Sequence, residues 1–460
     1  MGLDINEFRP ERGGNPNKVR ESQKKRNAKI ELVDEVIALD KGWVKTQFNY
    51  EAARKELNEK KKLIGERKKA NKNDTCDELM KEKEEIEQKI EQLQQINVQA
   101  KLNLDEKLKK IGNIVHDTVP VDNNEDNNRI ERTWGEKRIL QIDETPGKAH
   151  HHQILYMLDG FDQKRGSKVV GHRGYYLKNY GVILVQALLN FGQQFLMKKA
   201  YTPIQTPFFM KKSIMAETCQ LSDFDDQLYK VECGKPEESK EGKTEQTEDF
   251  YLIATSEQPI SAYHGGEYID NKELPIRYAG LSSCFRKEAG AAGKETWGIY
   301  RVHQFEKIEQ FVLCKPEDSW QELENMIKIS EEFMQALGLP YRIVNIVSGA
   351  LNDAAAKKYD LEAWFPGYSQ YKELVSCSNC TDFQSRGLNV TTGDVKDKKA
   401  EKVFVHMLNG TLCAAQRTLT CILENYQEKD GVRVPQVLQP FVGVDFIPYR
   451  QGMPKKNEFQ

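Results

Sequence analysis

The chain has 460 residues, of which 38% are hydrophobic and 30% are charged. This length is enough for two or three domains with a substantial core, and the charged fraction indicates a solvated helical segment. The formal net charge of −2 at pH 7 excludes a general electrostatic attraction to nucleic acid, so any RNA affinity must come from a local basic surface.

The cysteines and the distribution of apolar residues indicate the cellular compartment of the protein. The nine cysteines have no framework of close spacings, and the first residues contain no apolar signal segment. No window reaches the ~18 apolar residues that a membrane-spanning helix needs. We therefore expect a cytoplasmic protein with free thiols and no membrane association. For the lone CxxC of Cys377 and Cys380, packed thiols are favoured over a zinc site, because no second pair lies close by.

The N-terminal quarter carries two apolar seams with helical spacing. Apolar residues recur every seven positions from Val36 to Ile64, and a second seam runs from Leu79 to Ile96. The polar break at 70–74 is short, so we predict that the two helices fold back on each other as an antiparallel hairpin over about residues 40–110.

The first of these helices is basic and the second is acidic. A solvated coiled coil explains this difference, and so does an arm whose cations contact the backbone of an RNA. Both interpretations stay open. Under the second, the RNA-binding residues are Arg54, Lys55, Lys61, Lys62, Lys68 and Lys69.

A Pro-, Asp- and Asn-rich stretch at 119–131 is interpreted as a linker between an arm domain, 1–118, and a second domain, 132–460. The polar segment 234–249 is interpreted as a disordered insertion, and the run from His150 to His152 as a domain-edge feature. Strands and helices then mix without a βαβ rhythm, which favours an α+β fold, an antiparallel sheet flanked by helices. Strands are expected at 250–254, 279–286, 298–313, 341–347, 361–368 and 372–376, and helices at 182–198, 319–337 and 412–427.

The segment 285–311 places a glycine-rich turn between two predicted strands. Charged and aromatic residues flank the turn, and those of the return strand are spaced to share one face. Guanidinium groups suit phosphate, a ring suits a base, and a carboxylate suits an ammonium group or a metal. This predicts a nucleotide site, with a charged amphipathic hairpin as the alternative. The residues are Arg286 and Glu288 before the turn, and Arg301, Phe305 and Glu309 after it.

This segment resembles the second signature motif of the class II aminoacyl-tRNA synthetases. Residues 201–210, where a helix leads into an extended strand, resemble the first motif, which builds the dimer interface in that class. Residues 409–411, expected to cap a helix that carries Arg417, resemble the third motif; ordinary helix capping is the alternative. Segments 255–257 and 371–386 are similar to signatures of the seryl-tRNA synthetase family, and the whole resembles its eukaryotic cytosolic type.

The resemblance implies a homodimer that attaches L-serine to tRNA(Ser) through a seryl-adenylate, with ATP as substrate and Mg²⁺ as cofactor. It implies tRNA(Sec) as a further substrate where the organism has one. The residues implied to bind serine are Thr255, Ser256, Glu257, Arg286, Glu309, Ser376, Asn409 and Thr411. Those implied to bind ATP are Arg286, Lys287, Glu288, Arg301, Val302, His303, Gln304, Phe305, Glu373, Leu374, Val375, Ser376 and Arg417.

Within these sets, Arg286, Glu373 and Arg417 are implied to be catalytic, with Glu373 also holding the metal. Arg417 would face the γ-phosphate, and either Asn409 or Thr411 would hold the serine hydroxyl. Because Glu373 and Ser376 lie three residues apart, a regular strand would point them to opposite faces. We therefore expect a β-bulge or a strand end between them.

Two alternatives to this function remain. A synthetase-like paralogue would bind RNA or a partner without charging it, but it would not need the intact set of charged residues. A class II enzyme for threonine or proline is disfavoured by the helical arm and by the pair Thr255 and Glu257. The glycine-rich segment 290–298 is expected to be a mobile loop.

Overall fold

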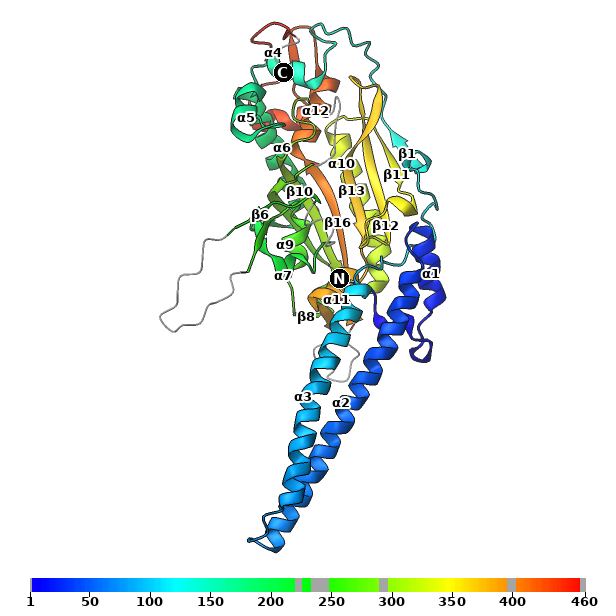
Figure 1. Cartoon of the computed structure of the whole chain (residues 1–460). Coiled ribbons are helices and arrows are strands. Elements are labelled where there is room, and N and C mark those ends of the chain that lie inside the picture. Colours follow the sequence, from blue (N-terminus) through cyan, green and yellow to red (C-terminus); the bar gives the residue numbers. More distant parts are fainter. Residues whose placement is uncertain (1, 220–225, 233–247, 289–296, 395–402, 456–460) are drawn as a thin grey trace, which may run out of the picture. The chain divides into compact units, whose positions relative to one another are not determined.

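The structure is a computed structural model that describes residues 2–219, 226–232, 248–288, 297–394 and 403–455. These residues form two compact units, one spanning Gly2–Ile114 and the other beginning at Val115 (Figure 1). Most of the predicted disordered insertion, 234–249, and of the predicted mobile loop, 290–298, lies outside the described residues. No described helix is long and apolar enough to cross a membrane.

The N-terminal unit is built on two long antiparallel helices, α2 (Glu31–Ala70) and α3 (Asp77–Leu108). This confirms the predicted hairpin, which begins earlier than expected. Val36, Ala53 and Ile64 are buried along the seam of α2, as the seven-residue spacing requires. Ion pairs such as the one between Lys60 Nζ and Glu82 Oε2, at 2.6 Å, join the basic helix to the acidic one.

Three short helices pack at the N-terminal end of α2: η1 (Ile5–Phe8), η2 (Pro10–Arg12) and α1 (Pro16–Lys25). Arg9 between them donates two hydrogen bonds, of 2.7 and 2.6 Å, to the carboxylate of Asp40 on α2. The side chain of Asp40 is almost fully buried, so this two-point contact fixes the N-terminal segment to the hairpin.

The second unit is built on an eight-stranded sheet with the order β1-β11-β12-β13-β16-β10-β9-β4. Neighbouring strands are antiparallel except β4 and β9, so the predicted α+β architecture is confirmed. The edge strand β1 begins at Arg129, inside the segment interpreted as a linker. The bounds are Arg129–Trp134 (β1), Tyr341–Asn345 (β11), Lys357–Phe365 (β12), Gln370–Asn379 (β13), His406–Ala414 (β16), Gln304–Cys314 (β10), Ile276–Phe285 (β9) and Thr202–Gln205 (β4).

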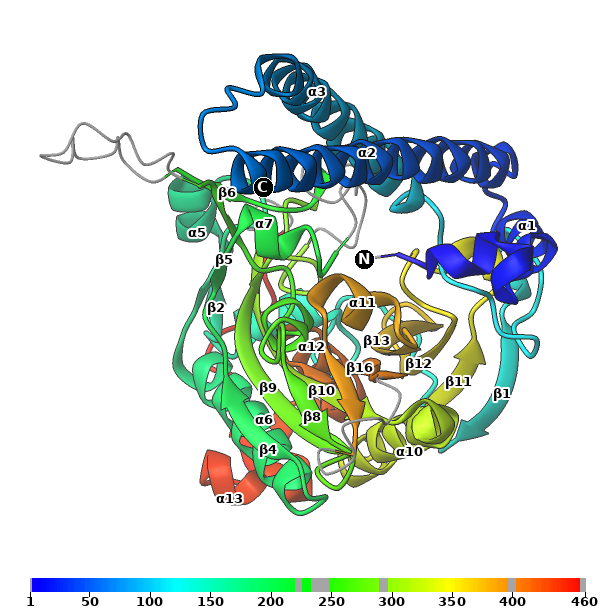
Figure 2. The same ribbon diagram turned by 90° about the horizontal axis from the view of Figure 1, so that it is seen from below.

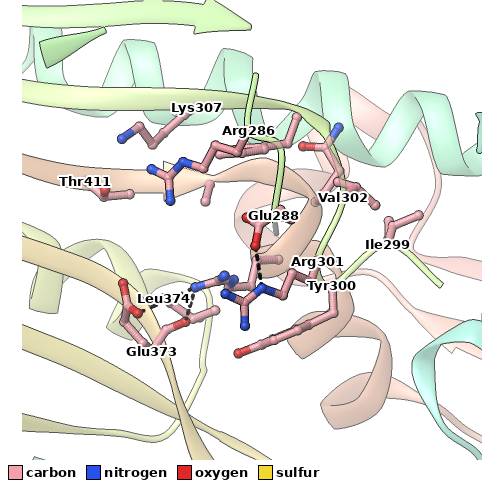
Figure 3. A pocket seen from close by; sticks show the side chains of 14 residues that line it. Arg286, Glu288, Ile299, Tyr300, Arg301, Val302, Lys307, Glu373, Leu374 and Thr411 are labelled. Carbon is pink, nitrogen blue, oxygen red and sulfur yellow. Dashed lines mark hydrogen bonds and ion pairs between the residues drawn. The ribbon is translucent and has the colours of Figure 1, made fainter. Parts of the chain in front are cut away.

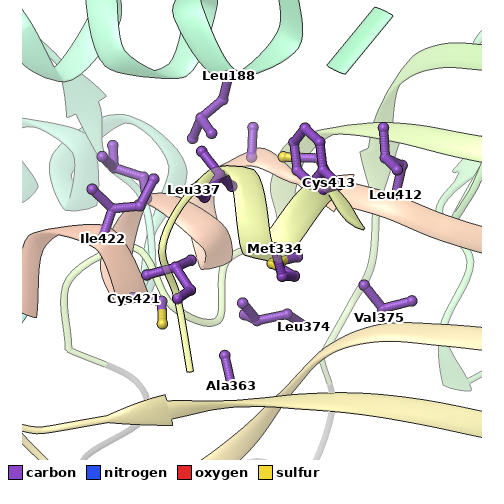
Figure 4. Close-up of a cluster of buried hydrophobic side chains, with 14 of the residues drawn as sticks. Leu188, Met334, Leu337, Ala363, Leu374, Val375, Leu412, Cys413, Cys421 and Ile422 are labelled. Atoms are coloured by element: carbon purple, nitrogen blue, oxygen red, sulfur yellow. The ribbon is translucent and has the colours of Figure 1, made fainter. Parts of the chain in front are cut away.

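Three helices share one hydrophobic core with this sheet: α6 (Asn179–Met197), α10 (Ser319–Ala336) and α12 (Ala415–Tyr426). Figure 4 shows Leu188 of α6, Met334 of α10 and Ile422 of α12 gathered over buried residues of the central strands. The rings of Phe191 and Phe333 stack at 5.3 Å between α6 and α10. The core therefore holds the central strands rigidly from one side.

Short elements frame the rest of this unit, and Figure 2 shows several of them around the large sheet. Two three-stranded sheets, β5-β7-β6 and β15-β14-β8, lie among them. The helices are α4 (His151–Met157), α5 (Gln163–Val170), α7 (Lys212–Met215), α9 (Glu257–Ser261), α11 (Phe383–Leu388) and α13 (Gln439–Val442). The strands are β2 (Phe161–Asp162), β3 (Tyr176–Leu177), β5 (Phe209–Lys211), β6 (Lys230–Val231), β7 (Phe250–Leu252), β8 (Tyr268–Asp270), β14 (Thr391–Gly393), β15 (Val403–Phe404), β17 (Gly431–Arg433) and β18 (Phe446–Pro448).

Two secondary-structure predictions are wrong. Residues 409–411 do not cap a helix but lie inside β16, and the helix begins only at Ala415. The apolar run there is a central strand paired on both sides, with β10 and β13. The strand predicted from residue 298 begins at Gln304, because Gly298 has a φ of +72° and starts a turn.

A third prediction, that the three histidines form a domain-edge feature, is also wrong. His151 is fully buried and His152 is 4% exposed, at the start of α4. By contrast, both cysteines of the CxxC are buried and neither forms a disulfide, as the packed-thiol interpretation predicted.

Replacing a core residue should destabilise the second unit far more than replacing an exposed residue of the same type. Ile343 on β11 is fully buried, and Ile343→Ala leaves a cavity, so the free energy of unfolding should fall by about 2–5 kcal/mol. Ile139 in the same unit is 73% exposed, and Ile139→Ala should change it by less than about 0.5 kcal/mol. Urea unfolding followed by circular dichroism compares the two. Equal losses would contradict this description of the core.

Candidate active site

One face of β10 supplies three side chains to the site. Phe305, Lys307 and Glu309 alternate with core residues, so they point the same way. β10 pairs with β9 on one side and with β16 on the other, and the second pairing places Glu309 opposite Thr411 of β16. Pairing on both sides fixes the positions of these groups along the strand.

Arg286 follows directly after β9. Its guanidinium carbon lies 5.4 Å from the ring centroid of Phe305, and its Nε donates to the carbonyl oxygen of Ala254 at 3.3 Å. The cation and the aromatic ring predicted for a nucleotide therefore face each other across β9 and β10.

The expected β-bulge is present on β13. Val375 pairs with Leu361 of β12, but the next pair joins Glu373 to Glu362, so Leu374 is an extra residue. This irregularity brings Glu373 and Ser376 to the lining of one cavity, although they are three residues apart.

Two cavities meet at this face of the sheet. Four residues line both of them: Arg286, Lys307, Glu373 and Thr411. Figure 3 shows Arg286 and Lys307 on one side of the first cavity and Glu373 on the other. The first cavity is also lined by Glu288, Ile299, Tyr300, Arg301, Val302, Phe305, Leu374, Ala414, Gln416 and Arg417. The second is also lined by Thr218, Cys219, Gln227, Ala254, Thr255, Glu257, Gln258, Glu309, Asn352, Ala354, Lys358, Ser376, Ser378 and Asn409.

The first cavity is rich in guanidinium groups. Arg301 Nε donates to Glu288 Oε2 at 2.6 Å (Figure 3). Arg417 Nη1 lies 3.7 Å from Glu373 Oε2, and its guanidinium carbon lies 4.9 Å from the ring centroid of Tyr300. Three arginines around one cavity, only two of them beside a carboxylate, suit a polyanionic ligand.

The second cavity is lined by buried acids. Lys307 Nζ lies 2.5 Å from Glu309 Oε2 and donates to Thr255 Oγ1 at 2.7 Å. Glu257 Oε1 accepts hydrogen bonds from Gln384 at 2.9 Å and from Asn409 at 3.0 Å. The ammonium group of a ligand would find the carboxylates of Glu257 and Glu309 here, and of these two Glu309 is the one beside Lys307.

Glu257 is the acid whose protonation the site perturbs. Burial raises its pKa to about 7, and the negative charge of Glu309 adds to the effect. The carboxyl group therefore changes charge near neutral pH, which makes its charge sensitive to any cation that enters the cavity.

Most of the sequence-predicted residues come together in these two cavities. Five do not belong to the described lining of either, namely Ser256, Lys287, His303, Gln304 and Val375. Ser256 is fully buried beside Gly280, and His303 Nδ1 lies 3.0 Å from the carbonyl oxygen of Arg286. These neighbours place both side chains behind the cavity lining.

Lys307, Tyr300 and Gln416 are among the lining residues of the first cavity that sequence reasoning missed. Lys307 had a usable signal, because it lies midway between Phe305 and Glu309 and must share their strand face. Tyr300 and Gln416 had none, because one lies in a turn and the other one residue into a helix.

The arm residues predicted to bind tRNA all lie on α2 and are exposed. Lys61 also pairs with Glu87 of α3 at 3.3 Å, and Arg54 lies over the ring of Tyr50 at 5.6 Å. Their exposure fits both a solvated coiled coil and a surface that binds RNA.

No group of three or more metal-ligating side chains occurs among the described residues. The carboxylate of Glu373 is 48% exposed and lines both cavities. This suits a hard cation that takes one protein carboxylate and completes its shell with phosphate oxygens and water, as Mg²⁺ does.

Comparison with known proteins agrees with this geometry. Residues 229–426 match the tRNA synthetase class II core domain (G, H, P, S and T), and residues 3–115 match the seryl-tRNA synthetase N-terminal domain. With the antiparallel sheet and its paired cavities, these matches define a class II aminoacyl-tRNA synthetase.

Relatives that match nearly the whole chain show to which family within this class the protein belongs. Cytoplasmic serine–tRNA ligase of Dictyostelium discoideum is 52% identical over 457 residues, covering 99% of this chain and 97% of its own. The chain belongs to the serine–tRNA ligase family. The "cytoplasmic" in the names of such relatives agrees with the expected compartment.

Two solved structures share the fold over 98% of this chain and 100% of their own. The cytoplasmic serine–tRNA ligase of Naegleria fowleri, in complex with AMP, is 48% identical with a TM-score of 0.82. Seryl-tRNA synthetase from Pyrococcus horikoshii, complexed with ATP, is 39% identical with a TM-score of 0.86.

Proposed function

We propose that this protein attaches L-serine to tRNA(Ser) in two steps, with ATP as the energy source. In the first step, a serine carboxylate oxygen attacks the α-phosphorus of ATP, and pyrophosphate leaves. In the second step, the terminal ribose hydroxyl of the tRNA attacks the carbonyl of the seryl-adenylate, and AMP leaves. The observation that carries this proposal is the pair of cavities that meet at Arg286, Lys307, Glu373 and Thr411.

The first cavity would hold ATP. Arg286 lies at the junction of the cavities, where it can neutralise both the α-phosphate and the serine carboxylate. The adenine would lie against Phe305, and Arg417 would face the γ-phosphate. Little covalent work is asked of the protein, because positioning and charge neutralisation lower the barrier of such a displacement.

The second cavity would hold serine. Its ammonium group would lie near Glu257 and Glu309. The hydroxyl would bond to Thr411, because the amide of Asn409 already donates to Glu257. Alanine would leave these buried polar partners unpaired, and a site of this kind can discriminate by about 10⁴.

Glu373 would hold Mg²⁺ against the phosphate oxygens. When bound, the ion would withdraw charge from the phosphates that Arg417 also contacts. The chain's own contribution is a half-exposed carboxylate beside an arginine, on a strand whose bulge aims it into the cavity.

The arm would hold the tRNA by shape and backbone contacts, because side chains read the major groove of A-form RNA poorly. Such recognition would extend to tRNA(Sec), where the organism has one. A homodimer is proposed through α6 and β4. β4 is one of the two edge strands of the large sheet and is mostly exposed, and Val182, Ile183 and Met197 of α6 are also exposed.

ATP–pyrophosphate exchange with a panel of amino acids tests the function. Serine should support exchange, whereas alanine, threonine and proline should support at least about 10³-fold less, because they lack the hydroxyl or carry extra volume. Exchange with threonine or proline but not serine would reassign the substrate. No exchange with any amino acid would favour a paralogue that binds RNA alone.

The variant Arg286→Ala tests the role of this arginine in the same exchange assay. Loss of the guanidinium at the junction should reduce exchange by at least about 10²-fold, on the scale of removing one charge-stabilising donor. Activity within about tenfold of wild type would show that Arg286 does not act on the phosphate.

The serine KM should depend on pH near neutrality. Below a pKa of about 7, Glu257 is protonated and neutral, so it no longer attracts the ammonium group; above it, the carboxylate is charged. The serine KM in exchange should therefore rise by about fivefold from pH 7 to pH 6, as the ionised fraction falls. Glu257→Gln should remove this step, while the ATP KM should stay flat over the range. A step that survives in Glu257→Gln would assign the titration to another group.

Neutralising arm lysines should weaken tRNA binding and leave exchange intact. The double variant Lys55→Gln/Lys62→Gln removes two exposed charges from one face of α2. It should raise the tRNA KM by about three- to tenfold and lower its salt dependence. Lys81→Gln/Lys89→Gln, on the acidic helix α3, is the matched control. Equal effects of both doubles would indicate a general charge effect instead of a binding surface.

A further inference from the structure

The three consecutive histidines form a buried assembly outside the described lining of both cavities. His151 begins α4, and this helix packs against α12. The rings of His150 and His152 stack at 5.7 Å, and His152 meets the ring of Trp297 edge-on at 5.4 Å. Histidines so deeply packed are uncommon unless their nitrogens have defined partners.

The ring of His151 lies between two hydrogen-bond acceptors. Its Nδ1 is 3.3 Å from Glu424 Oε1, and its Nε2 is 3.2 Å from the carbonyl oxygen of Trp297. A carbonyl oxygen only accepts, so a proton on Nε2 would be donated to Trp297. The side chains of His151 and Glu424 are both fully buried, so their contact is shielded from solvent.

Glu424 is itself held in place. Its two oxygens accept from the backbone N–H of His151 at 3.2 Å and from that of Gly367 at 2.9 Å. Glu424 lies on α12, the helix that also carries Arg417. The imidazole therefore links this helix to the backbone at Trp297.

Trp297 precedes the wall of the first cavity. The next residue, Gly298, has a φ of +72°, and a Cβ there would lie 2.7 Å from His151 Nε2. Residues 299–302 then line the cavity, with Tyr300 beneath the guanidinium of Arg417 and Arg301 bonded to Glu288. The imidazole thus sits against the backbone at the point where this wall begins.

We propose that His151, oriented by Glu424, is a positioning residue for the nucleotide cavity. By holding the carbonyl of Trp297, it fixes the positions of Tyr300 and Arg301 in the wall of the first cavity, where they would contact the nucleotide. This inference rests on the proposed ATP-dependent activation of serine and assigns a role to a residue that would not touch either substrate.

Steady-state pyrophosphate exchange with separate ATP and serine titrations tests the inference on the full-length protein. His151→Ala removes the contact between the imidazole and the carbonyl oxygen of Trp297, so the backbone there loses its support and the ATP KM should rise at least about fivefold. The serine KM should stay within about twofold, because residues 299–302 do not belong to the described lining of the second cavity. His151→Gln keeps one donor and should recover part of the ATP KM. Calorimetric ATP binding should weaken by the same factor.

His406→Ala is the matched control. His406 is also largely buried and lies 2.9 Å from Ser319 Oγ, but it is outside the described lining of both cavities. It should leave both KM values within about twofold, whatever its effect on stability. If His151→Ala does not fold, Glu424→Gln decides. One acceptor oxygen becomes an NH2 group that faces a backbone N–H, so His151 loses its orientation and the ATP KM should show the same selective rise.

Three results would overturn the inference: an unchanged ATP KM in folded His151→Ala, equal rises in both KM values, or no recovery in His151→Gln. An absence of exchange in the wild-type protein would instead reject the proposed function. Calorimetric ATP binding by His151→Ala would then still decide the inference, because it needs no turnover.

Discussion

The ion pair between Lys307 and Glu309, with its charged atoms 2.5 Å apart, is the contact on which the charge balance of the site depends. Both side chains are nearly buried, and removing one partner would leave the other charge uncompensated, at a cost of about 3–5 kcal/mol. Burial raises the pKa of the second acid, Glu257, to about 7, and the negative charge of Glu309 adds to the rise. The cavity is thereby ready for one further cation and has no need of a permanent one.

The order of the substrates follows from the geometry of a single strand. Phe305 lines only the first cavity, Lys307 lines both, and Glu309 lines only the second. Successive residues on one strand face are about 7 Å apart, so base, phosphate and amino acid would lie in line along β10. The next two strands of the sheet supply further lining residues. Thr411 of β16 lies opposite Glu309, and Glu373 comes from the bulge of β13. A regular β13 would have turned Glu373 away.

Local periodicity in the sequence predicted the helical arm and part of the strand that lines the site. The seven-residue seams predicted the arm because each contact along α2 recurs within the sequence itself. Strand alternation predicted that Phe305 and Glu309 share a face, and it should also have included Lys307. Strand alternation did not apply to Arg301, because a turn begins at Gly298, which has a positive φ, and the strand starts only at Gln304. The apolar run of β16 was assigned partly to a helix, since a strand buried on both faces shows no alternation.

What the sequence could not show are contacts between distant segments. The two partners of the His151 ring lie 273 and 146 residues away along the chain. No spacing rule reaches that far, so a run of histidines looks like a surface feature until the fold brings Glu424 and Trp297 to it. The sheet places the groups that would touch substrate, and local alternation makes many of them visible. The groups behind them come from helices and turns, so a residue such as His151 can control the nucleotide wall without any signature in the sequence around it.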